Sequence, residues 1–264
     1  MMLRKNFQLA SLSLLALAVL AIGCGGGDSG ESPAATGAEE SATSSGGDAP
    51  TGTASISGTV SYEGKVPSLR PIAMEADKDC AAMHSEPVAN ESLVLGDGST
   101  MANILVRVKG GLPSGSWPTP SEAVVMDQKG CKYVPHVFAV MVNQPIKILN
   151  SDGILHNVHA LPKINREFNT PMPGAVKETT KTFDKVEDVF VIKCDVHPWM
   201  RSYVAVYDHP YFSVTQKDGQ FSITGLPAGT YEIEAWHERL GTQTASVTLG
   251  DGESASQDFT FTRP

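Results

Sequence analysis

Short apolar and β-branched runs, separated by turn residues, recur along the chain after residue 54. In one of them Tyr231, Ile233 and Ala235 alternate with polar residues, the two-residue period of a strand that buries one face. One helical turn is predicted at 77–83. Many short strands at this spacing are typical of a β-sandwich or barrel, so we predict an all-β fold. The predicted strands cover residues 55–62, 103–109, 123–126, 136–142, 145–149, 188–193, 203–207, 220–224, 231–236, 243–249 and 257–262.

The N-terminus indicates export. Arg4 and Lys5 precede an apolar run at residues 8–22, which Gly23 and Cys24 follow. The run is too short for a membrane span, so residues 1–23 are predicted to be a signal peptide. Its end resembles a bacterial lipobox, which implies acylation of Cys24 and a lipid-anchored protein on the periplasmic or cell-surface face of a membrane. An ordinary cleaved signal is the alternative.

Residues 24–53 form a predicted tether. From residue 25 onward this stretch contains no aromatic residue and no Leu, Ile or Val, and it is rich in Gly, Ser and acidic residues. Such a segment cannot bury enough apolar surface to offset the entropy of ordering. We therefore expect a flexible linker between the anchor and the folded part.

Charge and composition exclude several classes of function. Without residues 1–23 the chain has 18 Lys+Arg against 29 Asp+Glu, a net charge of −11. Nucleic acid is therefore not an expected partner, because phosphate binding needs clustered positive charge. The sequence shows no Ser/His/Asp spacing, paired-carboxylate motif or phosphate loop, so we predict that the protein is not an enzyme.

The most informative motif places Cys194, His197 and Met200 three residues apart on one short loop. A thiolate, imidazoles and a weak thioether ligand form the copper sites that transfer electrons. One more histidine is needed, and His156 is the preferred candidate, with His159 as the alternative. These two would point to opposite faces of a strand, so only one can be a ligand.

Residues 122–208 resemble the cupredoxins of the plastocyanin and pseudoazurin type. The resemblance rests on three anchors, which are 133–135 (Tyr-Val-Pro), 150–157 and 194–200. It implies a Greek-key sandwich with one type 1 copper, three equatorial ligands, axial Met200, and Asn157 beside the Cys loop. Many family members have more residues between the last His and the Met. Trp199 either belongs to an apolar rim for partner docking or serves packing.

Residues 218–235 resemble a second family, the carboxypeptidase-regulatory-like (transthyretin-like) sandwich. Asp-Gly and Leu-Pro-Ala-Gly turns flank its strands, and 56–64 and 103–109 resemble its earlier strands. The resemblance implies a discontinuous sandwich. We predict that residues 54–116 and 211–264 form it, with the cupredoxin domain 117–210 inserted between them. A row of separate small modules is the alternative.

Two further cysteines, Cys80 and Cys131, remain. In an exported protein such a pair most often forms a disulfide. The alternative is a second metal site that also uses His84 and His136.

The sequence thus favours an exported, membrane-anchored blue copper protein. It would carry single electrons between redox proteins, such as a cytochrome or a respiratory complex, through Cu(II)/Cu(I). Alternatives are copper storage or delivery, and a structural or carbohydrate-binding surface module. An oxidase or reductase would need additional copper centres, and the seven scattered histidines disfavour it.

Overall fold

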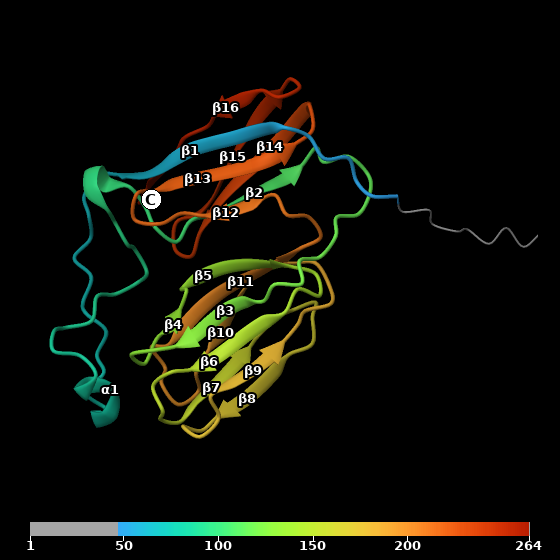
Figure 1. Cartoon of the computed structure of the whole chain (residues 1–264). Helices are drawn as coiled ribbons and strands as arrows, with labels where there is room; N and C mark the ends of the chain where they lie inside the picture. Colours follow the sequence, from blue (N-terminus) through green and yellow to red (C-terminus); the bar gives the residue numbers. More distant parts are fainter. Residues whose placement is uncertain (1–46, 264) are drawn as a thin grey trace, which may run out of the picture. The chain divides into compact units, whose positions relative to one another are not determined.

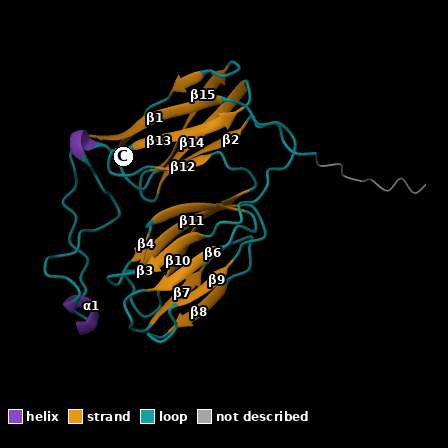
Figure 2. Cartoon of the chain, in the orientation of Figure 1, coloured by secondary structure: helices purple, strands orange, loops and turns teal. Residues whose placement is uncertain are grey.

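The computed structural model describes residues 47–263. The predicted signal peptide, Cys24 and most of the predicted tether lie outside the described residues. Nearly all regular structure in the described part is β (Figure 2), which confirms the all-β prediction. The elements are β1 (Ala54–Glu63), α1 (Lys78–Ala82), a 3₁₀ turn (Asp97–Ser99), β2 (Leu105–Gly110), β3 (Val124–Gln128), β4 (Tyr133–Val134), β5 (Val137–Met141), β6 (Ile146–Asn150), β7 (His156–Ala160), β8 (Phe168–Met172), β9 (Glu178–Lys181), β10 (Glu187–Lys193), β11 (Arg201–Tyr207), β12 (Phe212–Val214), β13 (Gln220–Leu226), β14 (Gly229–His237), β15 (Gly241–Leu249), β16 (Ser254–Ser256) and β17 (Phe259–Thr262).

One pair of sheets joins strands from both ends of the described chain. β1 lies between β13, which is antiparallel to it, and β16 and β17, which are parallel to it. The second sheet has the order β12-β2-β14-β15. β1 and β2 therefore complete sheets whose other strands follow residue 211 (Figure 1). Alternating burial in β1, β13 and β17 supplies one shared core.

The other pair of sheets comes from the continuous stretch β3 to β11. Its sheets have the orders β5-β11-β10-β7-β8 and β4-β3-β6-β9. A second core lies between them and includes Met126, Ile148, Val158, Ile192 and Val204. The strand pairing fits an inserted sandwich, while the predicted boundaries after residues 116 and 210 stay predictions.

β5 differs from a one-sided strand because all five of its residues are buried. Val137 and Ala139 belong to a small cluster with Leu105 of β2 and Ala205 and Tyr207 of β11. β5 thus packs on both faces, and this explains a continuous apolar run in place of strict alternation.

The sequence pattern missed several edge and short strands. β9 is polar, and β8 includes the polar residues Asn169 and Thr170 together with Pro171. Each pairs on one side only, β8 with β7 and β9 with β6. Edge strands tolerate proline and polar residues, so they carry little periodic signal.

The helical turn lies close to its predicted place. Asp77 caps α1 by accepting hydrogen bonds from the N–H groups of Asp79 and Cys80. The only regular helix turns in the described part are α1 and the 3₁₀ turn, and neither is long and apolar enough to cross a membrane.

Candidate metal centre

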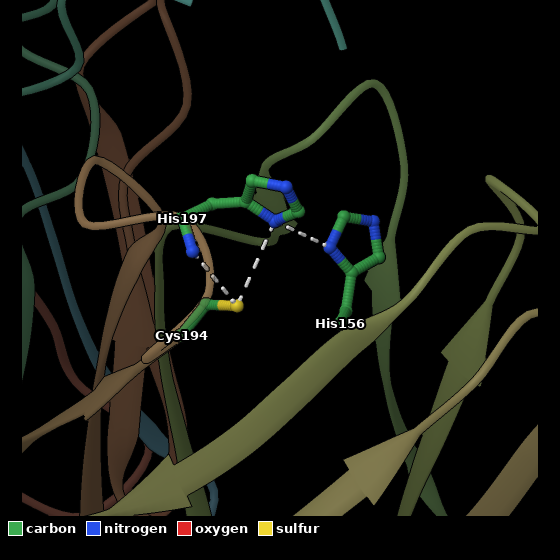
Figure 3. A group of neighbouring side chains, drawn as sticks. All are labelled: His156, Cys194 and His197. Atoms are coloured by element: carbon green, nitrogen blue, oxygen red, sulfur yellow. Dashed lines mark hydrogen bonds between the residues drawn. The ribbon is translucent and has the colours of Figure 1, made fainter. Parts of the chain in front are cut away.

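Three side chains converge at one end of the β3–β11 sandwich (Figure 3). His156 is the first residue of β7, Cys194 directly follows β10, and His197 lies in the loop before β11. Nδ1 of His156 is 2.9 Å from Nδ1 of His197, and that atom is 3.8 Å from Sγ of Cys194. The sequence motif and the upstream strand therefore meet in space.

The three side chains are enclosed. His156 has no exposed surface, and Cys194 and His197 are each 2% exposed. One donor atom from each lies within 4.8 Å of the other two. A buried set of two imidazoles and a thiol at this spacing matches the donor set of a copper site.

Each imidazole has its outer nitrogen bound to a carboxylate. Nε2–H of His156 donates to Asp152 (2.9 Å), and Nε2–H of His197 donates to Asp77 (3.2 Å). An ionised carboxylate can only accept, so these bonds fix the proton on Nε2. The Nδ1 lone pair of each neutral ring then points toward the other ring and the sulfur.

This geometry requires a positive charge between the rings. Two bare Nδ1 lone pairs cannot face each other at 2.9 Å, so a proton or a metal ion must lie between them. Burial opposes protonation of His156, but the hydrogen bond to Asp152 and the nearby Cys194 outweigh it and raise the pKa of His156 to about 9. The pocket is thus built to hold a cation, and the residues fit a copper ion.

The Cys194 loop is held by Asn157 of β7. Its Oδ1 accepts from the thiol (3.3 Å) and from N–H of Asp195 (2.7 Å). The backbone N–H of His197 also points at Sγ (3.4 Å). Burial raises the pKa of Cys194, but hydrogen bonds from His156 and from backbone groups lower it below its usual value overall. These hydrogen bonds therefore reduce the cost of forming the thiolate that a metal needs.

Met200 closes the loop. Its N–H donates to the carbonyl of His197 (2.9 Å), and its carbonyl accepts from N–H of Cys194 (3.2 Å). The side chain is 1% exposed and belongs to the same core cluster as Cys194. Met200 is thus a buried thioether on the ligand loop, and its role as axial ligand stays a prediction.

Trp199 packs beside the site. Its ring lies 5.2 Å from that of His197, and its Nε1–H donates to the carbonyl of Cys131 (3.0 Å). The side chain is half-buried. These contacts support the packing interpretation of Trp199.

His159 lies apart from the three converging donors. Its Nδ1 bonds Asp195 (2.8 Å) and its Nε2 bonds Glu167 (2.7 Å). Of the two candidate histidines, His156 is the one that the structure places with Cys194 and His197.

Cys80 and Cys131 form a disulfide. His84 bonds the carbonyl of Gly130 (2.9 Å), and His136 bonds Glu238 (2.8 Å). These two histidines therefore point to other partners, and the four residues do not make a second metal site.

Asp152 and Asp77 are the site residues that sequence reasoning missed. Asp152 lies four residues before His156, a spacing that could have indicated a contact. Asp77 is 120 residues from His197, and no local pattern connects them.

Comparison with known proteins bears on the fold. Residues 202–262 match the model for the carboxypeptidase regulatory-like domain, which confirms that predicted resemblance. Comparison with curated proteins gives no match.

Similar solved structures include a copper protein and a copper enzyme. A Cu-containing nitrite reductase from Thermus scotoductus SA-01 is 21% identical over 38% of this chain, at a TM-score of 0.31, and the match spans 26% of its chain. A mutant of amicyanin in its Cu(I) form is 21% identical over 38% of this chain and 97% of its own, at a TM-score of 0.29. A purple cupredoxin from Nitrosopumilus maritimus is 20% identical over 31% of this chain and 98% of its own, at a TM-score of 0.27. A likeness at this level carries no argument about function, so the functional conclusion depends on the site itself.

Proposed function

We propose that this protein is a type 1 copper protein that carries single electrons between redox partners. The observation that carries the proposal is the buried convergence of Nδ1 of His156, Nδ1 of His197 and Sγ of Cys194. Met200 on the same loop would supply the weak axial thioether. The chain would act as a carrier and not as an enzyme.

The protein's own contribution is a site fixed in advance. When bound, copper supplies a one-electron Cu(II)/Cu(I) couple, and sulfur ligands favour Cu(I). Asn157 holds the thiol and its loop, and the two carboxylates hold the rings. Because these groups are already oriented, little rearrangement is required between the two oxidation states.

Burial also separates the proposal from its main alternative. A protein that stores or delivers copper needs an exchangeable site, and the three donors here are at most 2% exposed. A structural or carbohydrate-binding module would not need a converging thiol and two imidazoles. The closed donor set therefore favours electron transfer.

Anchoring and partners belong to the same proposal. The lipobox-like Gly-Cys24 supports export and a lipid anchor on a bacterial membrane. Leu155 and Val196 each precede one of the ligand histidines, and they are 50% and 44% exposed. We place the contact with a redox partner at these apolar side chains. We expect a Cys24→Ser variant to be absent from the membrane fraction. If the variant stays in that fraction, the anchor does not depend on Cys24.

The first test is spectroscopic. The full chain loaded with Cu(II) should show an intense Cys-to-copper charge-transfer band in the visible, and Cys194→Ala should lose it. His159→Gln is the matched control, because His159 lies outside the donor set, and it should keep the band.

Two results would contradict the proposal. If the protein is pale and its copper EPR signal is unchanged in Cys194→Ala, copper does not bind at Cys194, and a structural or carbohydrate-binding module becomes the favoured function. If the site is coloured but loses its copper to a chelator within the mixing time, copper storage or delivery becomes the favoured function.

A further inference from the structure

Each histidine of the candidate centre is hydrogen-bonded to a carboxylate, and both carboxylates are bonded to the backbone of the same disulfide. Asp152 receives Nε2–H of His156, and Asp77 receives Nε2–H of His197. The question is what keeps these two carboxylates in place, since they come from segments far apart in the chain.

Asp152 is held by the backbone at Cys131. Its Oδ2 accepts from N–H of Cys131 (2.8 Å), and its Oδ1 accepts from N–H of Gly130 (2.6 Å). The side chain is 4% exposed. Three hydrogen bonds therefore hold Asp152 as a buried acceptor with a fixed direction.

Asp77 is held by the backbone at Cys80. Its Oδ1 accepts from N–H of Cys80 (3.0 Å) as the N-cap of α1, and its Oδ2 accepts from His197 (3.2 Å). This one side chain therefore links α1 to the ligand loop.

The disulfide joins the two anchors. Cys80 and Cys131 have no exposed surface, and their bond connects α1 covalently to the loop before β4. Each half-cystine donates its own N–H to the carboxylate that orients one histidine. Trp199 adds a bond from the ligand loop to the carbonyl of Cys131. A closed chain of contacts therefore runs from one imidazole through the disulfide to the other.

We infer that Asp77 and Asp152 are positioning residues for the metal-binding histidines, and that the Cys80–Cys131 disulfide holds both of them in register. Each carboxylate fixes the Nε2–H tautomer and the rotation of its ring, so that Nδ1 faces the metal position. Partners of this kind typically change metal affinity 10–100-fold when they are removed. For its metal readout the inference rests on the proposed copper site.

The test compares variants of the full chain purified in detergent. The Cys80→Ser/Cys131→Ser pair, Asp77→Ala and Asp152→Ala should each weaken Cu(I) binding roughly 10–100-fold in competition with bathocuproine disulfonate. Asp79→Ala is the matched control, because Asp79 lies on the same turn with an exposed side chain that does not contact a histidine. It should bind Cu(I) like the wild type.

A metal-free measurement distinguishes this inference from the proposed function. Long-range ¹H–¹⁵N NMR of the metal-free protein, recorded at a pH at which both rings are neutral, should show Nε2–H on both histidines in the wild type. Asp77→Ala should release the tautomer of His197 alone, and Asp152→Ala that of His156 alone. Asp77→Asn keeps an acceptor oxygen and should restore the His197 tautomer, which a merely structural role would not require.

The outcomes are separable. If the wild type lacks the copper charge-transfer band, the proposed function fails while the tautomer experiment still tests the positioning. If the aspartate variants keep both tautomers and bind Cu(I) within twofold of the wild type, the inference is overturned. The same holds if Asp79→Ala weakens binding as much as Asp77→Ala. Should the disulfide variant not fold, the two aspartate variants decide the matter with the disulfide intact.

Discussion

Asn157 offers the sharpest test of how the site is held together. Its Oδ1 accepts from N–H of Asp195 (2.7 Å) and from the Cys194 thiol (3.3 Å), and its Nδ2 donates to Oδ1 of Asn169 (2.6 Å). The residue is 6% exposed. Replacement by alanine removes all of these bonds at once.

The expected cost can be worked out from these contacts. Loss of the acceptor for the Asp195 N–H costs about 1 kcal/mol, because Asp195 is exposed and water can partly replace the lost bond. Loss of the bond to Asn169 adds about 1 kcal/mol. Asn157→Ala should therefore lower the free energy of unfolding by about 2 kcal/mol, which a domain of ordinary stability survives.

The assay combines urea unfolding with thiol reactivity in the metal-free protein. Loss of the Asn157 acceptor frees the loop that buries Cys194, so the thiol should become more accessible and its alkylation at neutral pH should be faster. Modification at Cys194 can be followed by peptide mass spectrometry.

Asn165→Ala is the matched control. Asn165 is 7% exposed and bonds Lys185 and Glu187, at the far end of β10 from Cys194. It should cost similar stability and leave the thiol unchanged. The reasoning is refuted if Asn157→Ala unfolds within 0.5 kcal/mol of the wild type, or if both variants alter the thiol equally.

Three further predictions concern stability. The Cys80→Ser/Cys131→Ser pair should lower the free energy of unfolding by about 4 kcal/mol, the chain-entropy cost of opening a loop with a sequence separation of 51; urea midpoints equal to the wild type would contradict this. His237 accepts two backbone N–H bonds on Nδ1, and burial lowers its pKa to about 4. The stabilisation by neutral His237 is therefore fully present above the unfolded pKa of about 6.5, and about 3 kcal/mol of it is lost as the pH falls to 4. In unfolding measured against pH, His237→Asn should make the free energy of unfolding depend less steeply on pH. Arg107 forms salt bridges with Asp188 and Glu234 (2.8 Å each). Arg107→Ala should lower the free energy of unfolding by about 2 kcal/mol, because the buried negative charge of Glu234 loses one of its two cationic partners. Lys109 is more exposed, so Lys109→Ala should have only a small effect in the same assay.

Local chemistry made much of the fold predictable. Turn residues and two-residue periods marked most buried strands, because a strand that buries one face repeats every second residue. Short edge strands such as β8 and β9 have few strongly apolar residues, so their signal was too weak and they were missed. β5 is a continuous apolar run because both of its faces are packed. The packing on its second face comes from a neighbouring sheet, so only the tertiary structure shows it.

The site divides in the same way. The sequence by itself identified the candidate donors on one loop, Cys194, His197 and Met200, because their spacing is local. The choice of His156 over His159 depended on which face of β7 turns toward that loop. Asp77 could be recognised only in the folded chain, since a contact across 120 residues is decided by how distant segments pack and by the disulfide that joins them.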